Sequence, residues 1–173
     1  MTPEHEREYV EYVTARGAPL RRLAFLLCGD GHRADDIVQQ TFVQLYVHWR
    51  RARTADHIDR YVRRMVLRAY LDERRRPWSR VRLFEAPPEP APGPPAGDPD
   101  ERAVLLAALA KVPPRQRAVV VLRFLYDLPV DEVAALLGCS PGTVKSQTAH
   151  GLTALRRLLG DGAPARAGRE SAR

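Results

Sequence analysis

Apolar residues recur at helical spacing through the first half of the chain and predict a series of helices. A short apolar edge at residues 9–13 comes first. It is followed by a second helix around 20–27 that should end at the Gly29-Asp30-Gly31 run. A third helix is predicted over 34–50 and a fourth over 58–76, where Pro77 stops it. The apolar stripes of these last two helices are Val38, Phe42, Leu45, Tyr46 and Trp49, and Ile58, Tyr61, Val62, Met65, Val66 and Ala69.

The second half of the chain predicts helices as well. An apolar helix over 102–112 is stopped by Pro113-Pro114, and a further helix is expected from 115 to about 126. The run Val119-Val120-Val121 would also suit a buried strand. We prefer a helix there, because the neighbouring segments are helical and no partner strand is visible. The predicted fold is therefore all-α.

Residues 130–159 combine a short helix, a glycine-containing turn and a longer basic helix, which is the arrangement of a helix-turn-helix. Apolar residues at 130, 133, 134 and 137 form one stripe of the first helix. Gly138 suits the left-handed conformation that ends a helix. Ser140 can cap the next helix, with Pro141 at its first position.

The outward face of the second of these helices carries candidate DNA contacts. Small residues near its start, such as Gly142, allow close approach to base edges, and Lys145 and His150 can address bases or phosphates. The alternative is a surface hairpin with a solvated polar face, but the agreement of cap, turn and polar face favours DNA binding. The predicted contacts are Thr143, Lys145, Ser146, Gln147, Ala149, His150, Arg156 and Arg157.

A proline-rich stretch separates the two helical halves. Seven prolines fall between Pro87 and Pro99, which excludes the interior of a helix and predicts an extended linker. We therefore expect two small helical domains, 1–84 and 102–160, joined by a flexible linker over 85–101. The tail 161–173, rich in Gly, Ala and Arg, should be disordered.

Arginines dominate the outer face of the predicted helix 58–76. Asp72 and Glu73 are the only acids between Arg60 and Arg82, which favours a track for phosphates over an ordinary solvated face of mixed sign. Tyr61 and Tyr70 add aromatic surface that could stack on unpaired bases, although Tyr61 lies on the apolar stripe and favours core packing. The predicted contacts of this helix are Arg60, Tyr61, Arg64, Arg68, Tyr70, Arg74, Arg75 and Arg76.

Composition narrows the range of functions. The 173 residues carry a formal net charge of +7, which favours a nucleic acid or another polyanion as partner. No apolar run approaches the roughly 18 residues that span a bilayer, and the charged N-terminus lacks a signal-peptide core, so we expect a cytoplasmic, nucleoid-associated protein. Cys28 and Cys139 form neither a metal-ligand cluster nor a disulfide framework. We predict no catalytic residues, no metal, no cofactor and no small-molecule substrate.

Three segments in this order resemble the extracytoplasmic-function (ECF) group of the sigma-70 family of bacterial sigma factors. ADDIVQQTFVQLY at 34–46 resembles the polymerase-docking helix of that family, and DRYVRRMVLRAYLDERRR at 59–76 resembles its promoter-melting helix. The segment at 106–146, LAALAKVPPRQRAVVVLRFLYDLPVDEVAALLGCSPGTVKS, resembles its reader of the upstream promoter element. The resemblance covers about 20–159 and looks closest to the actinobacterial SigE-like subgroup.

The resemblance implies a role for each segment. The first would dock on a coiled-coil of the largest subunit of core RNA polymerase through Asp35, Asp36, Gln39, Gln40 and Gln44. The second would open the duplex by holding a flipped base in a pocket, with the loop 51–57 as a candidate wall. The third would place Lys145 and His150 toward the major groove, while the polymerase flap would be a further contact. This chain has Gln40 where the family usually has glutamate, and Arg68 where it often has asparagine.

The function predicted from these patterns is that of a sigma factor, which binds core RNA polymerase and directs promoter-specific initiation by recognising and melting DNA. Two alternatives stay open. One is a helix-turn-helix regulator that acts without replacing a sigma factor, and the other is a basic RNA-binding assembly protein. The existence of an anti-sigma factor as a partner is also left open by the sequence.

Overall fold

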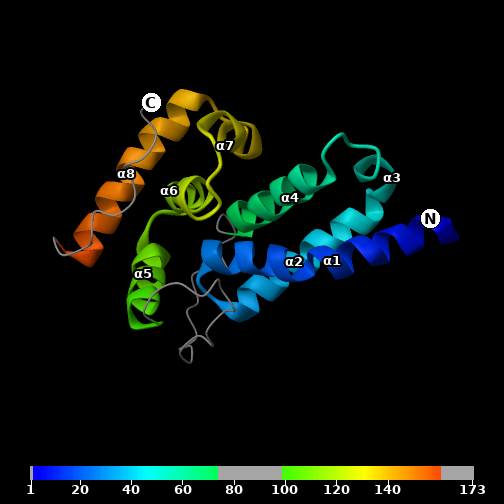
Figure 1. The fold of residues 1–173 in the computed structure, drawn as a ribbon, viewed down its shortest axis with the longest axis horizontal. Coiled ribbons are helices and arrows are strands. Elements are labelled where there is room, and N and C mark those ends of the chain that lie inside the picture. The colour runs from blue at the N-terminus through cyan, green and yellow to red at the C-terminus, as the bar shows by residue number, and fades with distance from the viewer. Residues whose placement is uncertain (1, 74–98, 161–173) are drawn as a thin grey trace, which may run out of the picture.

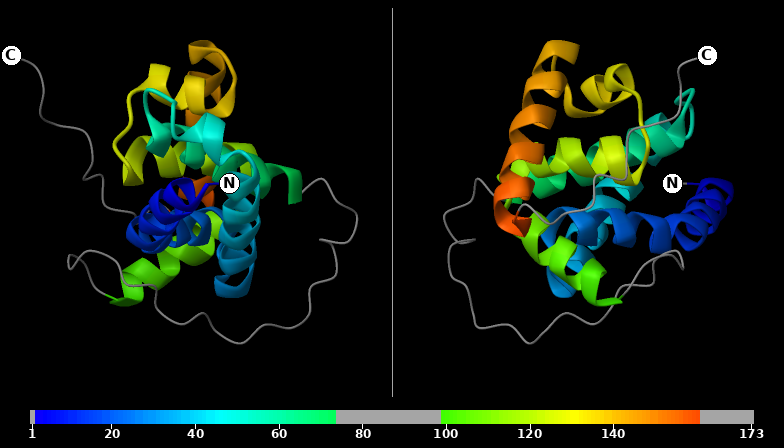
Figure 2. Two further views of the ribbon diagram at one scale, coloured as in Figure 1. Left: turned by 90° about the vertical axis from the view of Figure 1, so that its right-hand side faces the viewer. Right: turned by 60° about the vertical axis from the view of Figure 1, so that its left-hand side comes forward.

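The computed structural model describes residues 2–73 and 99–160, and every regular element in these two ranges is helical, as predicted. The N-terminal half contains α1 (Pro3–Cys28), α2 (Gly31–Val47), the short α3 (Trp49–Ala52) and α4 (Ile58–Glu73). The C-terminal half contains α5 (Pro99–Lys111), α6 (Pro114–Val120), a π-helical turn (Val121–Leu125), α7 (Val130–Leu137) and α8 (Pro141–Leu159). Figure 1 and the right view of Figure 2 show α8 along one edge of the molecule beside α6 and α7, with the start of α1 at the opposite end.

The first helix is longer than predicted. The apolar edge at 9–13 and the segment 20–27 were expected as separate elements, but both belong to α1, which continues through Pro19. Pro19 removes one backbone donor from the helix, and packing of the segments on both sides of it against the rest of the N-terminal half offsets that loss. The predicted stop is correct, because Gly29 adopts the left-handed conformation (φ 75°) and its N–H donates to the carbonyl of Phe25.

Other helix bounds differ from the predictions by a few residues. Asp30 caps α2 by accepting a hydrogen bond from the Arg33 N–H at 2.7 Å, so this helix begins at Gly31, three residues before the predicted start. It ends at Val47, and the last predicted residues form α3 instead. The segment 115–126 is helical, as preferred over a strand, and its last part is a π-helical turn in which the Tyr126 N–H donates to the Val121 carbonyl.

Buried apolar side chains of the two halves form one continuous core. In the N-terminal half it is built around Leu23, Leu45 and Val66, and in the C-terminal half around Leu122 and Val144. The halves also touch directly, because α4 packs against α7 and α1 packs against α5 and α6. The predicted linker 85–101 and tail 161–173 lie outside the described residues, except that 99–101 begin α5 and so are not linker. Within the described ranges, no helix is long and apolar enough to cross a membrane.

Candidate nucleic-acid interface

The turn between α7 and α8 has the geometry that its sequence predicts. Gly138 ends α7 in the left-handed conformation, with φ 64° and ψ 43°. Ser140 then caps α8: its Oγ accepts a hydrogen bond from the Thr143 N–H at 3.1 Å, and Pro141 occupies the first turn. These local features fix where α8 begins and orient it relative to α7.

The outward face of α8 is open to solvent. Six of the eight predicted contacts are exposed, and the other two, Thr143 and Gln147, are half-buried. The Ser146 hydroxyl donates to the Thr143 carbonyl at 3.0 Å, so in this conformation its proton is engaged within the helix. The Ser146 hydroxyl can still accept a hydrogen bond. Lys145 can donate hydrogen bonds, and the His150 ring can donate or accept one. The exposed six are Lys145, Ser146, Ala149, His150, Arg156 and Arg157.

The inward face of α8 packs tightly on α6. Val144 is fully buried and Leu155 nearly so, as the apolar stripe predicts. Gly151, which the sequence analysis did not single out, sits where the two helices approach each other. A Cβ at this position would lie 2.7 Å from Val120 Cγ2 and 3.3 Å from the Gln116 carbonyl oxygen. The absence of a side chain at Gly151 therefore allows the helices their observed separation.

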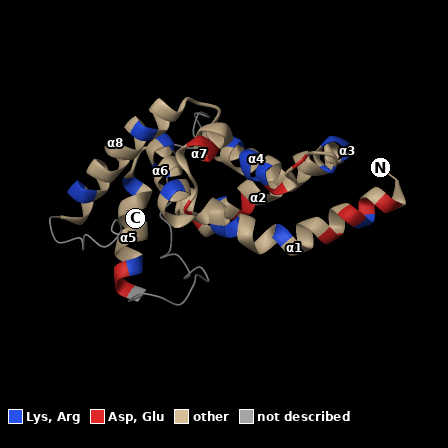
Figure 3. Ribbon diagram, turned by 45° about the horizontal axis from the view of Figure 1, so that its top comes forward, with Lys and Arg blue, Asp and Glu red and all other residues tan. Residues whose placement is uncertain are grey.

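The arginine face of α4 is partly covered by the other half of the molecule. Arg60 and Arg63 each lie 4.0 Å from the Glu132 carboxylate of α7, and the Arg63 guanidinium lies 5.7 Å from the centre of the Tyr126 ring. Burial raises the pKa of Tyr126, and the positive charge of Arg63 opposes that rise. Arg64 and Arg68 remain exposed. Figure 3 shows basic residues on both α4 and α8, while acidic residues gather at the start of α1.

The two tyrosines predicted to stack on bases are placed differently. Tyr61 is half-buried against the core, as its position on the apolar stripe favours. Tyr70 has no exposed surface and lies in the core between helices, so its ring offers no face for a base in this structure. Its predicted stacking role is therefore wrong for the observed arrangement: Tyr70 is a core residue. Arg74, Arg75 and Arg76 lie outside the described residues.

The polar residues predicted to dock on the polymerase all lie on the exposed side of α2. Asp36, Gln39, Gln40 and Gln44 have open side chains, and Asp35 is also exposed but forms an ion pair with Arg21. This ion pair links α2 to α1, so the Asp35 carboxylate already has a cationic partner within the chain.

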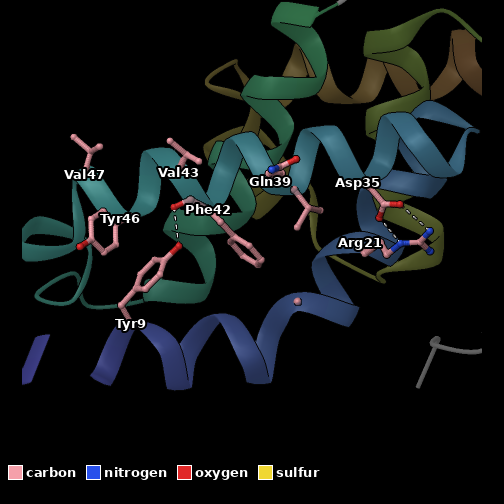
Figure 4. Close-up of a pocket in the computed structure, with 10 residues that line it drawn as sticks. Tyr9, Arg21, Asp35, Gln39, Phe42, Val43, Tyr46 and Val47 are labelled. Carbon is pink, nitrogen blue, oxygen red and sulfur yellow. Dashed lines mark hydrogen bonds and ion pairs between the residues drawn. The ribbon is translucent and has the colours of Figure 1, made fainter. Parts of the chain in front are cut away.

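An apolar groove lies beside these polar residues, and the sequence analysis missed it. The groove, of about 590 Å³, runs between α1 and α2, with Tyr9 on one wall and Phe42 and Val43 on the other (Figure 4). Val43 and Val47 are 57% and 67% exposed, although both are aliphatic. Their signal in the sequence was a second apolar pair four residues apart, next to the main stripe of this helix. The lining residues are Tyr9, Gly17, Arg21, Asp35, Val38, Gln39, Phe42, Val43, Tyr46 and Val47.

Arg117 is a second feature that the sequence reasoning missed. The residue is 1% exposed, and its guanidinium donates to the Leu27 carbonyl at 2.7 Å and to the Val112 carbonyl at 3.3 Å, with a further bond to the Ala110 carbonyl. It thereby links α6 to the C-terminal end of α1. Such a buried charge satisfied by backbone carbonyls has no sequence signal, because its partners are atoms that every residue carries.

Cysteine and metal-type side chains form no site in the part of the chain that the structure describes. Cys28 is buried and its Sγ donates to the Asp30 carbonyl, while Cys139 is half-buried. No group of three or more His, Cys, Asp or Glu side chains in those ranges could hold a metal ion.

Two family models match the chain, one in each half. The family described as sigma-70 region 2 matches residues 12–80, and the family described as sigma-70, region 4, matches residues 102–155. The first match includes most of α1 and all of α2 and α4, and the second includes the helix-turn-helix up to Leu155.

Curated relatives extend this similarity over most of the chain. The chain is 37% identical over 157 residues to the RNA polymerase sigma-E factor of Streptomyces coelicolor, covering 88% of this chain and 86% of that protein. It is 33% identical over 158 residues to the ECF RNA polymerase sigma factor SigE of Mycolicibacterium smegmatis, covering 86% of this chain and 60% of the relative.

Solved structures share the fold. The sigma factor RpoE from Bartonella quintana, determined with the anti-sigma factor NepR, aligns with a TM-score of 0.71 at 18% identity, covering 88% of this chain and 97% of RpoE. CnrH, determined with the cytosolic domain of CnrY, aligns with a TM-score of 0.60 at 23% identity, covering 92% and 91% of the two chains. The two family matches and the curated relatives place the chain in the ECF group of the sigma-70 family of RNA polymerase sigma factors.

Proposed function

We propose that this sigma factor reads a promoter through two separate basic surfaces, α8 for the upstream element and the arginine face of α4 for the downstream element and its melting. The observation that carries the proposal is the pairing of a capped, solvent-open α8 with a second exposed arginine surface at Arg64 and Arg68 on another helix. Phosphate contacts from such arginines supply affinity, and contacts at base edges from Lys145 and His150 supply sequence preference.

Core RNA polymerase would dock on α2. The exposed amides and carboxylates on this helix lie beside an apolar groove, so the surface combines an apolar contact with polar groups along one side of it. That combination is typical of protein interfaces, in which buried apolar groups supply most of the affinity and polar groups fix the register. Val43 and Val47 are the apolar contacts, with Asp36, Gln39 and Gln40 beside them.

The isolated chain should bind promoter DNA weakly. Glu132 of α7 faces Arg60 and Arg63 of α4, so a carboxylate occupies the position that a phosphate oxygen would take on these two side chains. With the two halves packed in this way, α4 and α8 are not free to take up the spacing of two promoter elements. Docking on polymerase would separate and space them.

Two further parts of the function follow from family membership. The protein would act without catalytic residues of its own. It would act in the cytoplasm, where RNA polymerase transcribes the chromosome. An anti-sigma factor belongs among its partners, since the solved relatives RpoE and CnrH were each determined with such a partner or with a cytosolic domain bound.

The test is run-off transcription with purified bacterial core polymerase on genomic promoter fragments. A start-site-specific transcript that needs both core and this chain supports the proposal. Tight promoter binding by the chain alone, with no core-dependent transcript, would instead identify a helix-turn-helix regulator. Salt-sensitive RNA binding without promoter preference would identify an RNA-binding protein.

A further inference from the structure

The first four turns of α1 run beside the loop 53–57, which connects α3 to α4. Arg53, the first residue of this loop, donates from Nε and Nη2 to the two carboxylate oxygens of Glu8, both at 2.7 Å. The geometry is bidentate, and both side chains are about one-third exposed. Because of the hydrogen bond from Arg53, the pKa of Glu8 lies below its usual value.

The far end of the same loop is held by α1 as well. Asp59, in the first turn of α4, accepts a hydrogen bond from the Tyr12 hydroxyl at 3.0 Å and one from Arg16 Nη2 at 2.8 Å. Burial and the hydrogen bond to Asp59 both raise the pKa of Tyr12, so its hydroxyl remains a donor at neutral pH. Glu8, Tyr12 and Arg16 are spaced four residues apart and therefore share one face of α1.

Aromatic packing joins this face to the core. Trp49 of α3 is 3% exposed, and its ring centre lies 5.4 Å from that of Tyr9 and 5.8 Å from that of Tyr12. The Tyr9 hydroxyl also donates to the Phe42 carbonyl of α2 at 2.9 Å. An exposed ion pair alone contributes little to stability, but a bidentate pair and two hydrogen bonds above a packed aromatic cluster fix one geometry.

The loop itself has little else to hold it. Arg53, Thr54, Asp56 and His57 are exposed, and Ala55 is the half-buried residue among them. The hydrogen bonds within it are local, from Thr54 Oγ1 to carbonyls of α3 and from the Ala55 N–H to the Ala52 carbonyl. A site that receives a flipped base works best when it is formed beforehand, because ordering the loop during binding costs free energy.

We propose that Glu8, Tyr12 and Arg16 are positioning residues that hold the loop 53–57 ready to receive the unpaired promoter base. The proposal rests on the proposed function, promoter melting, and on the expectation that the segment 51–57, which includes this loop, is a wall of the base pocket. Glu8 and Tyr9 precede the residues that match the region 2 family model, which begin at 12. The contacts that hold the loop therefore include a part of α1 that lies outside the family match.

The experiment compares Glu8→Gln and Tyr12→Phe with the wild-type chain, each bound to core polymerase. Glu8→Gln removes the charge and one of the two oxygens that accept from Arg53 of the loop, and Tyr12→Phe removes the hydroxyl that donates to Asp59 at the start of α4. Both substitutions nearly keep the size of the side chain. Strand separation is followed by 2-aminopurine fluorescence on a duplex promoter and on the same promoter with a pre-melted bubble. Glu11→Gln is the matched control, since Glu11 is an exposed acid on the same helix and its substitution removes the same charge as Glu8→Gln.

We expect each variant to open the duplex promoter about fivefold less well than the wild type, the loss that about one surface ion pair or hydrogen bond supplies. Activity on the pre-melted promoter, core binding and melting temperature should stay close to wild type, and Glu11→Gln should change none of them. Unchanged opening of the duplex would overturn the proposal, as would equal losses on both templates or loss of core binding. If the wild-type chain itself gives no core-dependent opening, the proposed function fails instead, whatever the variants do.

Discussion

The helix-turn-helix of α7 and α8 and the arginine helix α4 are both basic surfaces of this chain, yet their surroundings differ. The outward face of α8 is open along its length, while two arginines of α4, Arg60 and Arg63, face a carboxylate of α7. The helix-turn-helix therefore leaves the outward face of α8 exposed but covers part of the arginine face of α4.

This difference separates two properties of a binding surface. Residue types and spacing decide which chemistry a surface can perform, and both helices satisfy that requirement. Tertiary packing decides whether the surface is accessible to a ligand. Here the outward face of α8 is accessible, while part of the arginine face of α4 is covered. We therefore expect substitutions on α4 and on α8 to affect different steps of initiation and the recognition of different promoter elements.

The largest expected effect comes from reversing the open charges of α4. Arg64→Glu with Arg68→Glu should lower strand separation by about 100-fold, since two charge-assisted contacts at about 1.5 kcal/mol each are lost. Run-off transcription and 2-aminopurine fluorescence on a duplex promoter measure it. The control is Arg7→Glu with Lys111→Glu, which changes the net charge equally at exposed positions outside the predicted contacts. Equal losses in both double variants would remove the special role of α4.

A smaller and more specific effect is expected on α8. His150→Ala should change the base preference at one position of the upstream element by about 1–3 kcal/mol, because a base-edge contact is lost. Arg156→Ala should instead weaken binding evenly across sequences and lower the salt slope by about one unit. Transcription from a set of single-base promoter variants distinguishes them. Loss of the same base preference in both variants would show that these roles are assigned wrongly.

The support of α8 gives a prediction about stability. Gly151→Ala would place a Cβ 2.7 Å from Val120 Cγ2, and should lower the free energy of unfolding by about 1–2 kcal/mol through overpacking. Gly142→Ala is the matched control on the same helix, since its Cβ would meet only Ser140 Oγ, at 3.8 Å. Thermal unfolding should show a lower midpoint for Gly151→Ala alone. Equal midpoints would mean that α6 and α8 adjust freely.

The smallest effect tests the shielding of α4 itself. Glu132→Gln should raise the affinity of the isolated chain for promoter DNA by less than about fivefold, because the pairs with Arg60 and Arg63 are long and partly exposed. Asp131→Asn, at an exposed acid in the same turn, controls for net charge. Fluorescence anisotropy with a labelled promoter fragment measures both variants. An identical rise in affinity for both variants would show that Glu132 acts only through the net charge of the chain.

Much of this architecture was predictable because its causes are local. Gly138 and Ser140 set the end of α7 and the start of α8 by their own conformations and hydrogen bonds, so the helix-turn-helix matches its prediction. The exposed side of α2 follows in the same way from helical spacing. By contrast, the continuity of α1 through Pro19 depends on tertiary packing that outweighs a local preference.

The features that the sequence did not reveal depend on distant partners. Tyr70 had the residue type for base stacking, but the fold buries it. Arg117 reaches the backbone carbonyl of Leu27, and Glu132 meets arginines, each from the other half of the chain. No spacing rule encodes such contacts, because they arise only when the two halves pack together.

The central claim is that the two surfaces read one promoter together only when polymerase holds them apart. The direct measurement is the dissociation constant for one labelled promoter fragment, with the chain alone and with the chain bound to core polymerase, at a fixed salt concentration. The account predicts at least about 100-fold tighter specific binding with core, and loss of that gain when the spacer between the two elements changes by half a helical turn. Equal affinity with and without core, or no dependence on the spacer, would contradict it.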